Sequence, residues 1–181
     1  GKGGRYRMAR SRGGARELDS EEHAAVLLDW LRRYPIVAIE DPLAEDDAEG
    51  LAQFTRAAGK HVQVIGDDFL VTNAARVERA AALGACNTVL VKPNQAGTLT
   101  EAKATWDTAR KLGWGAIVSA RSGETEDVTI VHLAVGWGVP QIKVGSFARS
   151  ERMVKWNEGL RLADQLSGGC LPPRSAFPWG R

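Results

Sequence analysis

The sequence is poor in cysteine, with only Cys86 and Cys170 among its 181 residues. Two cysteines are too few for a disulfide framework or for a zinc site of the usual cysteine spacing. Disulfides are rare in the reducing cytoplasm, and the scarcity of cysteine fits that compartment. We therefore expect a cytoplasmic protein.

Long apolar runs and a strong net charge are missing as well. No apolar stretch of the chain approaches the roughly 18 residues that a membrane-spanning helix needs. The formal net charge is only +2, so overall charge favours neither nucleic acid nor a membrane as partner. Hydrophobic residues make up 44% and charged residues 25%, which is typical of one globular domain with a sizeable core.

Positive charge is nevertheless concentrated at the start of the chain. Basic residues before the first acidic one, Glu17, are Lys2, Arg5, Arg7, Arg10, Arg12 and Arg16. Glycines are frequent in the same stretch, and such a segment buries little. We predict that residues 1–17 form a flexible, solvated loop, with a phosphate-binding basic arm as the alternative.

Helical and strand patterns alternate regularly between residues 18 and 166. The segments with a strand pattern are 36–39, 61–65, 88–91, 115–119 and 141–144. The segments with a helical pattern are about 19–34, 46–58, 73–82, 99–112, 128–135 and 151–166. Short, β-branched strands of this kind indicate a parallel sheet with both faces buried. The pattern predicts an α/β fold of about five βα units, followed by an irregular tail over residues 167–181.

A charged residue lies at or just after the carboxyl end of each predicted strand. These residues are Glu40, Asp67, Lys92, Arg121 and Lys143. The intervals between them each fit about one βα unit. Because the carboxyl ends of parallel strands meet at one edge, where ligands bind in such folds, we expect all five side chains to converge there.

The residue types at this edge suggest a chemistry. Glu40 and Asp67 offer the carboxylate oxygens that Mg²⁺ prefers, although each could instead pair with a lysine or cap a helix. Two ammonium groups in one site repel each other, which favours loss of a proton from one of them, so Lys92 or Lys143 could act as a general base. The alternative is that these lysines only form salt bridges with Glu40 and Asp67.

Arg121 and Ser122 lie between a predicted strand and a predicted helix. A guanidinium, a hydroxyl and free backbone N–H groups are suited to binding a phosphate. For the acidic residues that follow, beginning with Glu124, we expect a structural role at the N-terminus of the next helix.

Five segments of the chain resemble the enolase family. They read YPIVAIEDPLAEDD (34–47), GDD followed by VTN (66–73), KPNQAGTL (92–99), SARSGETED (119–127), and QIK followed by ARSER (141–152). The segments have the same order as in enolases, and the resemblance extends from about residue 18 to residue 162. It implies that the chain is the C-terminal part of a TIM-type (β/α)₈ barrel.

The resemblance implies a role for each of these edge residues. Glu40 and Asp67 would bind the Mg²⁺ that holds the carboxylate of a small phosphorylated substrate. Lys92 would remove the proton beside that carboxylate, and Lys143 would stabilise the resulting negative charge. Arg121 and Ser122 would hold the phosphate of the substrate.

The resemblance also predicts what the chain needs in order to work. A full barrel takes about 250 residues and eight βα units, so we expect the N-terminal half to come from the same or another chain. Enolases are usually homodimers or larger assemblies. Within the present chain we expect the barrel portion to cover residues 18–166.

One departure from the family bears on function. Enolases carry histidine where this chain has Ala120, and smaller changes occur at Ala96 and at residues 146–147. Alanine at position 120 removes a proton carrier and enlarges the site. Three functions follow: an enolase that converts 2-phosphoglycerate to phosphoenolpyruvate, a carboxyphosphonoenolpyruvate synthase-like enzyme that uses 2-phosphoglycerate with a phosphonate co-substrate in antibiotic biosynthesis, or a non-catalytic remnant of an enolase.

Overall fold

The computed structural model describes residues 4–11, 14–166, 169 and 171–180. Lys2 and Arg12 of the predicted basic segment lie outside the described residues, as does Cys170. The other cysteine, Cys86, is buried and free.

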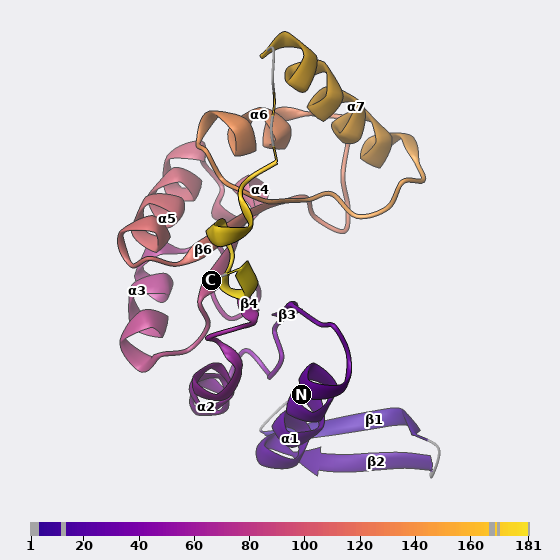
Figure 1. Ribbon diagram of the computed structural model, residues 1–181, viewed down its shortest axis with the longest axis vertical. Helices are drawn as coiled ribbons and strands as arrows, with labels where there is room; N and C mark the ends of the chain where they lie inside the picture. The colour runs from indigo at the N-terminus through magenta and orange to yellow at the C-terminus, as the bar shows by residue number, and fades with distance from the viewer. Residues whose placement is uncertain (1–3, 12–13, 167–168, 170, 181) are drawn as a thin grey trace.

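Five parallel strands form the central sheet. They are β3 (Ala38–Glu40), β4 (Gln63–Gly66), β5 (Thr88–Val91), β6 (Gly115–Ser119) and β7 (Ile142–Lys143). Their order in space is the same as their order in the chain, and every neighbouring pair is parallel. The sheet is curled like part of a barrel (Figure 1), which confirms the predicted α/β fold with five βα units.

One helix precedes this sheet in the chain, and at least one helix follows each of its strands. The helices are α1 (Ser20–Arg33), α2 (Ala48–Ala58), α3 (Ala74–Leu83), α4 (Pro93–Ala96), α5 (Leu99–Lys111), α6 (Thr129–Gly136) and α7 (Ser150–Gln165). Figure 1 shows α2, α3 and α5 along the outer side of the curled sheet. The short helix α4 was not predicted, whereas the other boundaries lie close to the expected ones.

The core lies between the sheet and these outer helices. Val64, Val89 and Val118 are fully buried in one cluster with side chains such as Phe54 of α2 and Val77 of α3. The alternate strand positions face the other way and form a smaller cluster of Ile65, Leu90 and Ile117. Both faces are therefore apolar, as the continuous hydrophobic strands predicted.

The N-terminal segment is not the solvated loop that its composition indicated. Residues Arg5–Ser11 form β1 and residues Gly14–Asp19 form β2, which pair as an antiparallel hairpin. Tyr6 and Leu18 join the hydrophobic core, with 7% and 3% exposure. The Tyr6 hydroxyl donates to Asp47 and accepts from the backbone N–H of Ala44. The loop prediction is wrong for these described residues because two apolar side chains anchor an otherwise basic hairpin.

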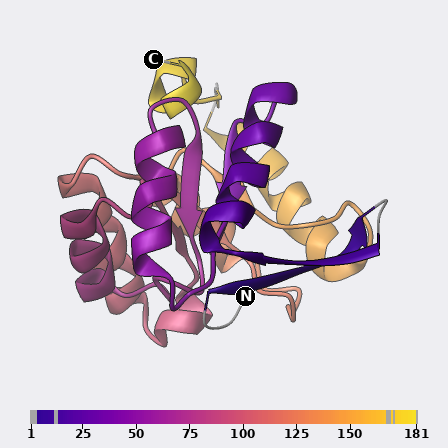
Figure 2. The same cartoon turned by 90° about the horizontal axis from the view of Figure 1, so that it is seen from below.

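Local signals at the helix ends are well matched by the structure. Asp19 and Glu22 form the capping box expected at the start of α1, each side chain accepting a hydrogen bond from the backbone of the other. After α7, the described tail contains only two short 3₁₀ turns, η1 (Arg174–Ala176) and η2 (Pro178–Gly180). Figure 2 shows the hairpin and α4 at one end of the molecule and the tail at the other.

None of the helices in the described part of the chain combines the length and apolar character that crossing a bilayer requires.

Candidate active site

A cavity of about 510 Å³ lies at the carboxyl ends of the strands. Its lining includes Asp67, Lys92, Arg121, Ser122 and Lys143. These residues come from the ends of β4, β5, β6 and β7, so the structure brings together residues that are scattered in the sequence. The predicted convergence is therefore observed for four of the five strand-end residues, whereas Glu40 does not line this cavity and contacts one of its lining residues, Lys143.

Asp67 and Lys92, which both line this cavity, form a buried ion pair. Lys92 Nζ lies 2.5 Å from Asp67 Oδ2, and the two side chains are 9% and 11% exposed. Gly66 precedes Asp67, and a Cβ at Gly66 would lie only 2.5 Å from a methyl carbon of Leu70, so Leu70 packs directly against the backbone at this strand end. The backbone N–H of Lys92 donates to Thr72 Oγ1 at 3.0 Å, which fixes the start of the segment after β5.

Glu40 and Lys143 form a second, more exposed ion pair. Lys143 Nζ lies 2.5 Å from Glu40 Oε2, with side-chain exposures of 43% and 33%. Glu40 ends β3 and Lys143 ends β7, so this contact joins the two edge strands of the sheet. The salt bridges that were the alternative interpretation of the lysines are both present. They do not exclude catalysis, because both lysines also line the cavity.

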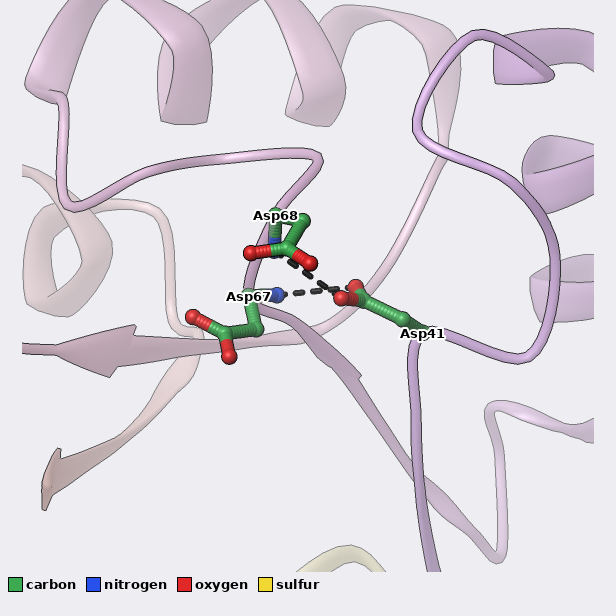
Figure 3. A group of neighbouring side chains, drawn as sticks. All are labelled: Asp41, Asp67 and Asp68. Atoms are coloured by element: carbon green, nitrogen blue, oxygen red, sulfur yellow. Dashed lines mark hydrogen bonds between the residues drawn. The ribbon is translucent and has the colours of Figure 1, made fainter. Parts of the chain in front are cut away.

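Asp41, which directly follows Glu40, connects the ends of β3 and β4. Its carboxylate accepts hydrogen bonds from the backbone N–H groups of Asp67 and Asp68, both at 2.9 Å (Figure 3). Burial raises the pKa of Asp41, and the two N–H donors oppose that shift by stabilising the charged form. Asp41 therefore holds the backbone of Asp67 in place.

The carboxylates at this point fit a divalent cation. One oxygen each of Asp41, Asp67 and Asp68 lie within 4.8 Å of one another. Asp67 Oδ1 is buried and finds no hydrogen-bond partner among the residues that the structure describes, which is costly unless something else satisfies it. Hard oxygen donors of this kind suit Mg²⁺. This arrangement is compatible with a cation at Asp67, and the ligand roles predicted for Asp67 and Glu40 both stay predictions.

The segment after β6 carries the residues predicted to bind phosphate. Arg121 and Ser122 are exposed, and both line the cavity. Ala120 is only 6% exposed and also lines the cavity, with its N–H bonded to the carbonyl of Lys143. Of the acidic residues expected to serve the N-terminus of α6, Asp127 does so, because its Oδ1 accepts the N–H of Thr129 at 2.8 Å, whereas Glu124 does not. Its carboxylate accepts the N–H of Arg121 at 2.7 Å instead, because the segment turns back on itself before α6 begins.

Sequence reasoning missed two residues that organise the site. Thr72 is 3% exposed, and its hydroxyl accepts the N–H of Lys92. Arg152 is 5% exposed, lines the cavity and donates to backbone carbonyls of the segment after β6. Thr72 lies in the loop that follows Asp67, and Arg152 belongs to the ARSER motif. The position of each residue in the sequence does not indicate which groups its side chain contacts.

Comparison with known proteins identifies relatives of the chain. Residues 3–171 match the family described as "Enolase, C-terminal TIM barrel domain". The chain is 45% identical over 175 residues to "Enolase 1" of Desulfitobacterium hafniense (strain Y51). This alignment covers 96% of the present chain but only 39% of that relative. The chain thus spans well under half the length of this curated relative.

Proposed function

The chain belongs to the enolase family, and we propose that it supplies the C-terminal part of the active site of a Mg²⁺-dependent enolase-type lyase. The reaction is dehydration of 2-phosphoglycerate to phosphoenolpyruvate. The observation that carries this proposal is the cavity lined by Asp67, Lys92, Arg121 and Lys143. It brings together an acid, two amines and a guanidinium, which matches a substrate with a carboxylate and a phosphate.

Lys92 is proposed as the base. It would take the proton from the carbon beside the substrate carboxylate, while the hydroxyl on the next carbon leaves as water. Mg²⁺, when bound, would supply the positive charge that stabilises the carboxylate as it gains a second negative charge. The ion pair with Asp67 keeps Lys92 at the cavity, where the substrate carbon would lie.

Lys143, Arg121 and Ser122 are proposed to bind the charged parts of the substrate. The Lys143 ammonium is 43% exposed at the side chain and lines the cavity, so it can turn from Glu40 to the negative charge that forms during proton removal. Arg121 and Ser122 can offer N–H and O–H donors to the phosphate. The group that protonates the leaving hydroxyl would come from the N-terminal half.

Ala120 favours a second candidate function. Its small side chain lines the same cavity where enolases have histidine, so the site has more room and lacks a proton carrier. An enolase-like transferase could place a phosphonate-bearing co-substrate there, as in carboxyphosphonoenolpyruvate synthase. In that reaction the hydroxyl oxygen of 2-phosphoglycerate would form a bond to the phosphorus of the co-substrate instead of leaving. The substituent displaced from that phosphorus would leave with the bonding electrons, and the hydroxyl proton would pass to a base of the site.

We also propose that the active protein is cytoplasmic and assembles as a homodimer or larger. The missing barrel half would come from the rest of the same polypeptide or from another chain, because five βα units cannot close a barrel.

The test is to incubate the complete protein with Mg²⁺ and 2-phosphoglycerate and to follow phosphoenolpyruvate by its ultraviolet absorbance. Fast formation supports the lyase. Tight binding of 2-phosphoglycerate without dehydration supports the transferase. If the protein neither binds nor converts 2-phosphoglycerate, it is a non-catalytic remnant of an enolase. In that case the ion pairs of Lys92 and Lys143 only stabilise the fold.

A further inference from the structure

We propose that Arg152 and Lys155 of α7 are positioning residues that hold the phosphate-binding segment, residues 120–125, in the shape it needs. This inference rests on the proposed function only for the identity of the substrate. It starts from the burial of these two cationic side chains, which are 5% and 1% exposed. The other charged residues of α7 are partly or fully exposed.

The guanidinium of Arg152 donates hydrogen bonds to backbone carbonyls of the phosphate-binding segment. Its Nη1 donates to the carbonyl of Arg121 at 3.0 Å and to that of Val144 at 3.0 Å, and its Nη2 donates to the carbonyl of Ser122 at 2.9 Å. No ion pair with a carboxylate is found for Arg152 in the described part of the chain. A buried guanidinium is costly without partners, so these carbonyl dipoles are what stabilise its charge.

Lys155 holds the other end of the same segment. It lies one helical turn after Arg152, so both side chains leave the same side of α7. Lys155 Nζ lies 3.1 Å from a carboxylate oxygen of Glu124, with side-chain exposures of 0% and 6%. It also donates to the carbonyl of Thr125 at 2.8 Å.

Glu124 links the two ends of this arrangement. One of its carboxylate oxygens accepts the N–H of Arg121, and the other faces Lys155. The segment is thus held at Arg121, Ser122, Glu124 and Thr125 by contacts that do not use the side chains of Arg121 and Ser122. Those two side chains stay exposed toward the cavity, preorganised to receive a phosphate.

Arg152 also sets the distance between two parts of the site. Its single planar guanidinium donates to carbonyls after β6 and after β7. The phosphate-binding segment and the segment after Lys143 are therefore held at a fixed distance from each other. A guanidinium can bridge such acceptors because its donors have fixed directions, whereas an ammonium is a compact point charge. Lysine at position 152 should therefore replace arginine only in part.

The test compares Arg152→Met and Arg152→Lys with the wild type, all in the complete protein. The matched control is Arg161→Met, which removes an exposed arginine of the same helix that pairs with Glu158. Calorimetry measures the affinity for inorganic phosphate and, separately, for Mg²⁺. Hydrogen exchange measures the protection of residues 120–125.

We expect Arg152→Met to weaken phosphate binding by about tenfold or more and to speed exchange of residues 120–125. Its Mg²⁺ affinity should stay within about twofold of the wild type, because Asp67 is held by other contacts. Arg152→Lys should recover part of the phosphate affinity, and Arg161→Met should behave as the wild type. If Arg152→Met does not fold, Glu124→Ala replaces it, because it removes the contacts of Glu124 with Lys155 and with the N–H of Arg121.

The proposal is overturned if a folded Arg152→Met or Glu124→Ala variant keeps wild-type phosphate affinity and exchange. It is also overturned if the wild type does not bind phosphate, or if Mg²⁺ and phosphate affinity fall equally. A wild type that binds phosphate but does not convert 2-phosphoglycerate contradicts the proposed lyase and leaves the role of Arg152 standing.

Discussion

Replacement of Lys92 by methionine should destabilise the protein markedly, because it leaves a buried carboxylate without its counter-charge. The two side chains of this pair are 9% and 11% exposed, with 2.5 Å between Lys92 Nζ and Asp67 Oδ2. Removing one partner of a buried pair costs about 3–5 kcal/mol. Because Asp67 borders a cavity, we expect about 3 kcal/mol, a large share of the roughly 5–15 kcal/mol by which domains are stable.

Urea unfolding of the complete protein, extrapolated to water, measures this loss. Lys143→Met is the matched control, since its pair with Glu40 is 43% and 33% exposed and exposed pairs contribute only about 0–1 kcal/mol. The double variant Lys92→Met/Asp67→Asn should recover most of the stability, because no unpaired charge remains. Equal losses for Lys92→Met and Lys143→Met, or a double variant as unstable as the sum of its single changes, would refute the reasoning.

Further predictions concern the chemistry of the site. Lys92→Ala should lower lyase turnover by about 10²–10⁴-fold, as loss of a general base does; turnover at the wild-type rate in a steady-state assay would exclude it as the base. Glu40→Gln should weaken Mg²⁺ binding by at least about tenfold if this carboxylate is a ligand, and calorimetry showing unchanged affinity would remove it from the ligand set. Ala120→His should raise dehydration by about 10²-fold in an otherwise enolase-like cavity, whereas no gain would favour the transferase. Burial raises the pKa of the Cys86 thiol from 9.0 to about 12, so iodoacetamide at pH 8 should label it only in unfolded protein. The same pKa shift contributes to the free energy of unfolding below pH 9, and this contribution is lost as the pH rises toward 12. A Cys86 thiol that reacts quickly in the folded protein would contradict its burial.

Local features of the sequence predicted the main elements because each depends on neighbours along the chain. The capping box of Asp19 and Glu22 starts α1 where expected, and the apolar runs 88–91 and 115–119 coincide with β5 and β6. The basic N-terminal segment was misjudged for the opposite reason. Its composition indicates solvent exposure, but Tyr6 and Leu18 find an apolar surface that only the folded chain provides.

The strand-end residues of the site could be predicted from their spacing, but their partners could not. Repeated βα units place Asp67, Lys92 and Lys143 at one edge whatever the details of packing. The partner of each side chain depends on how far the sheet curls. Lys143 and Glu40, for example, are separated by 103 positions in the chain and meet only because the edge strands approach each other.

The sequence by itself determined the order of strands and helices, the polar edge of the sheet and the family to which the chain belongs. These follow from periodicity, turn residues and motifs, which act over short stretches of chain. Only the tertiary structure decided that Asp41 holds the backbone of Asp67 and that Arg152 holds the phosphate-binding segment. Both contacts use backbone groups as partners, and every residue has those groups, so no residue type in the sequence could indicate them.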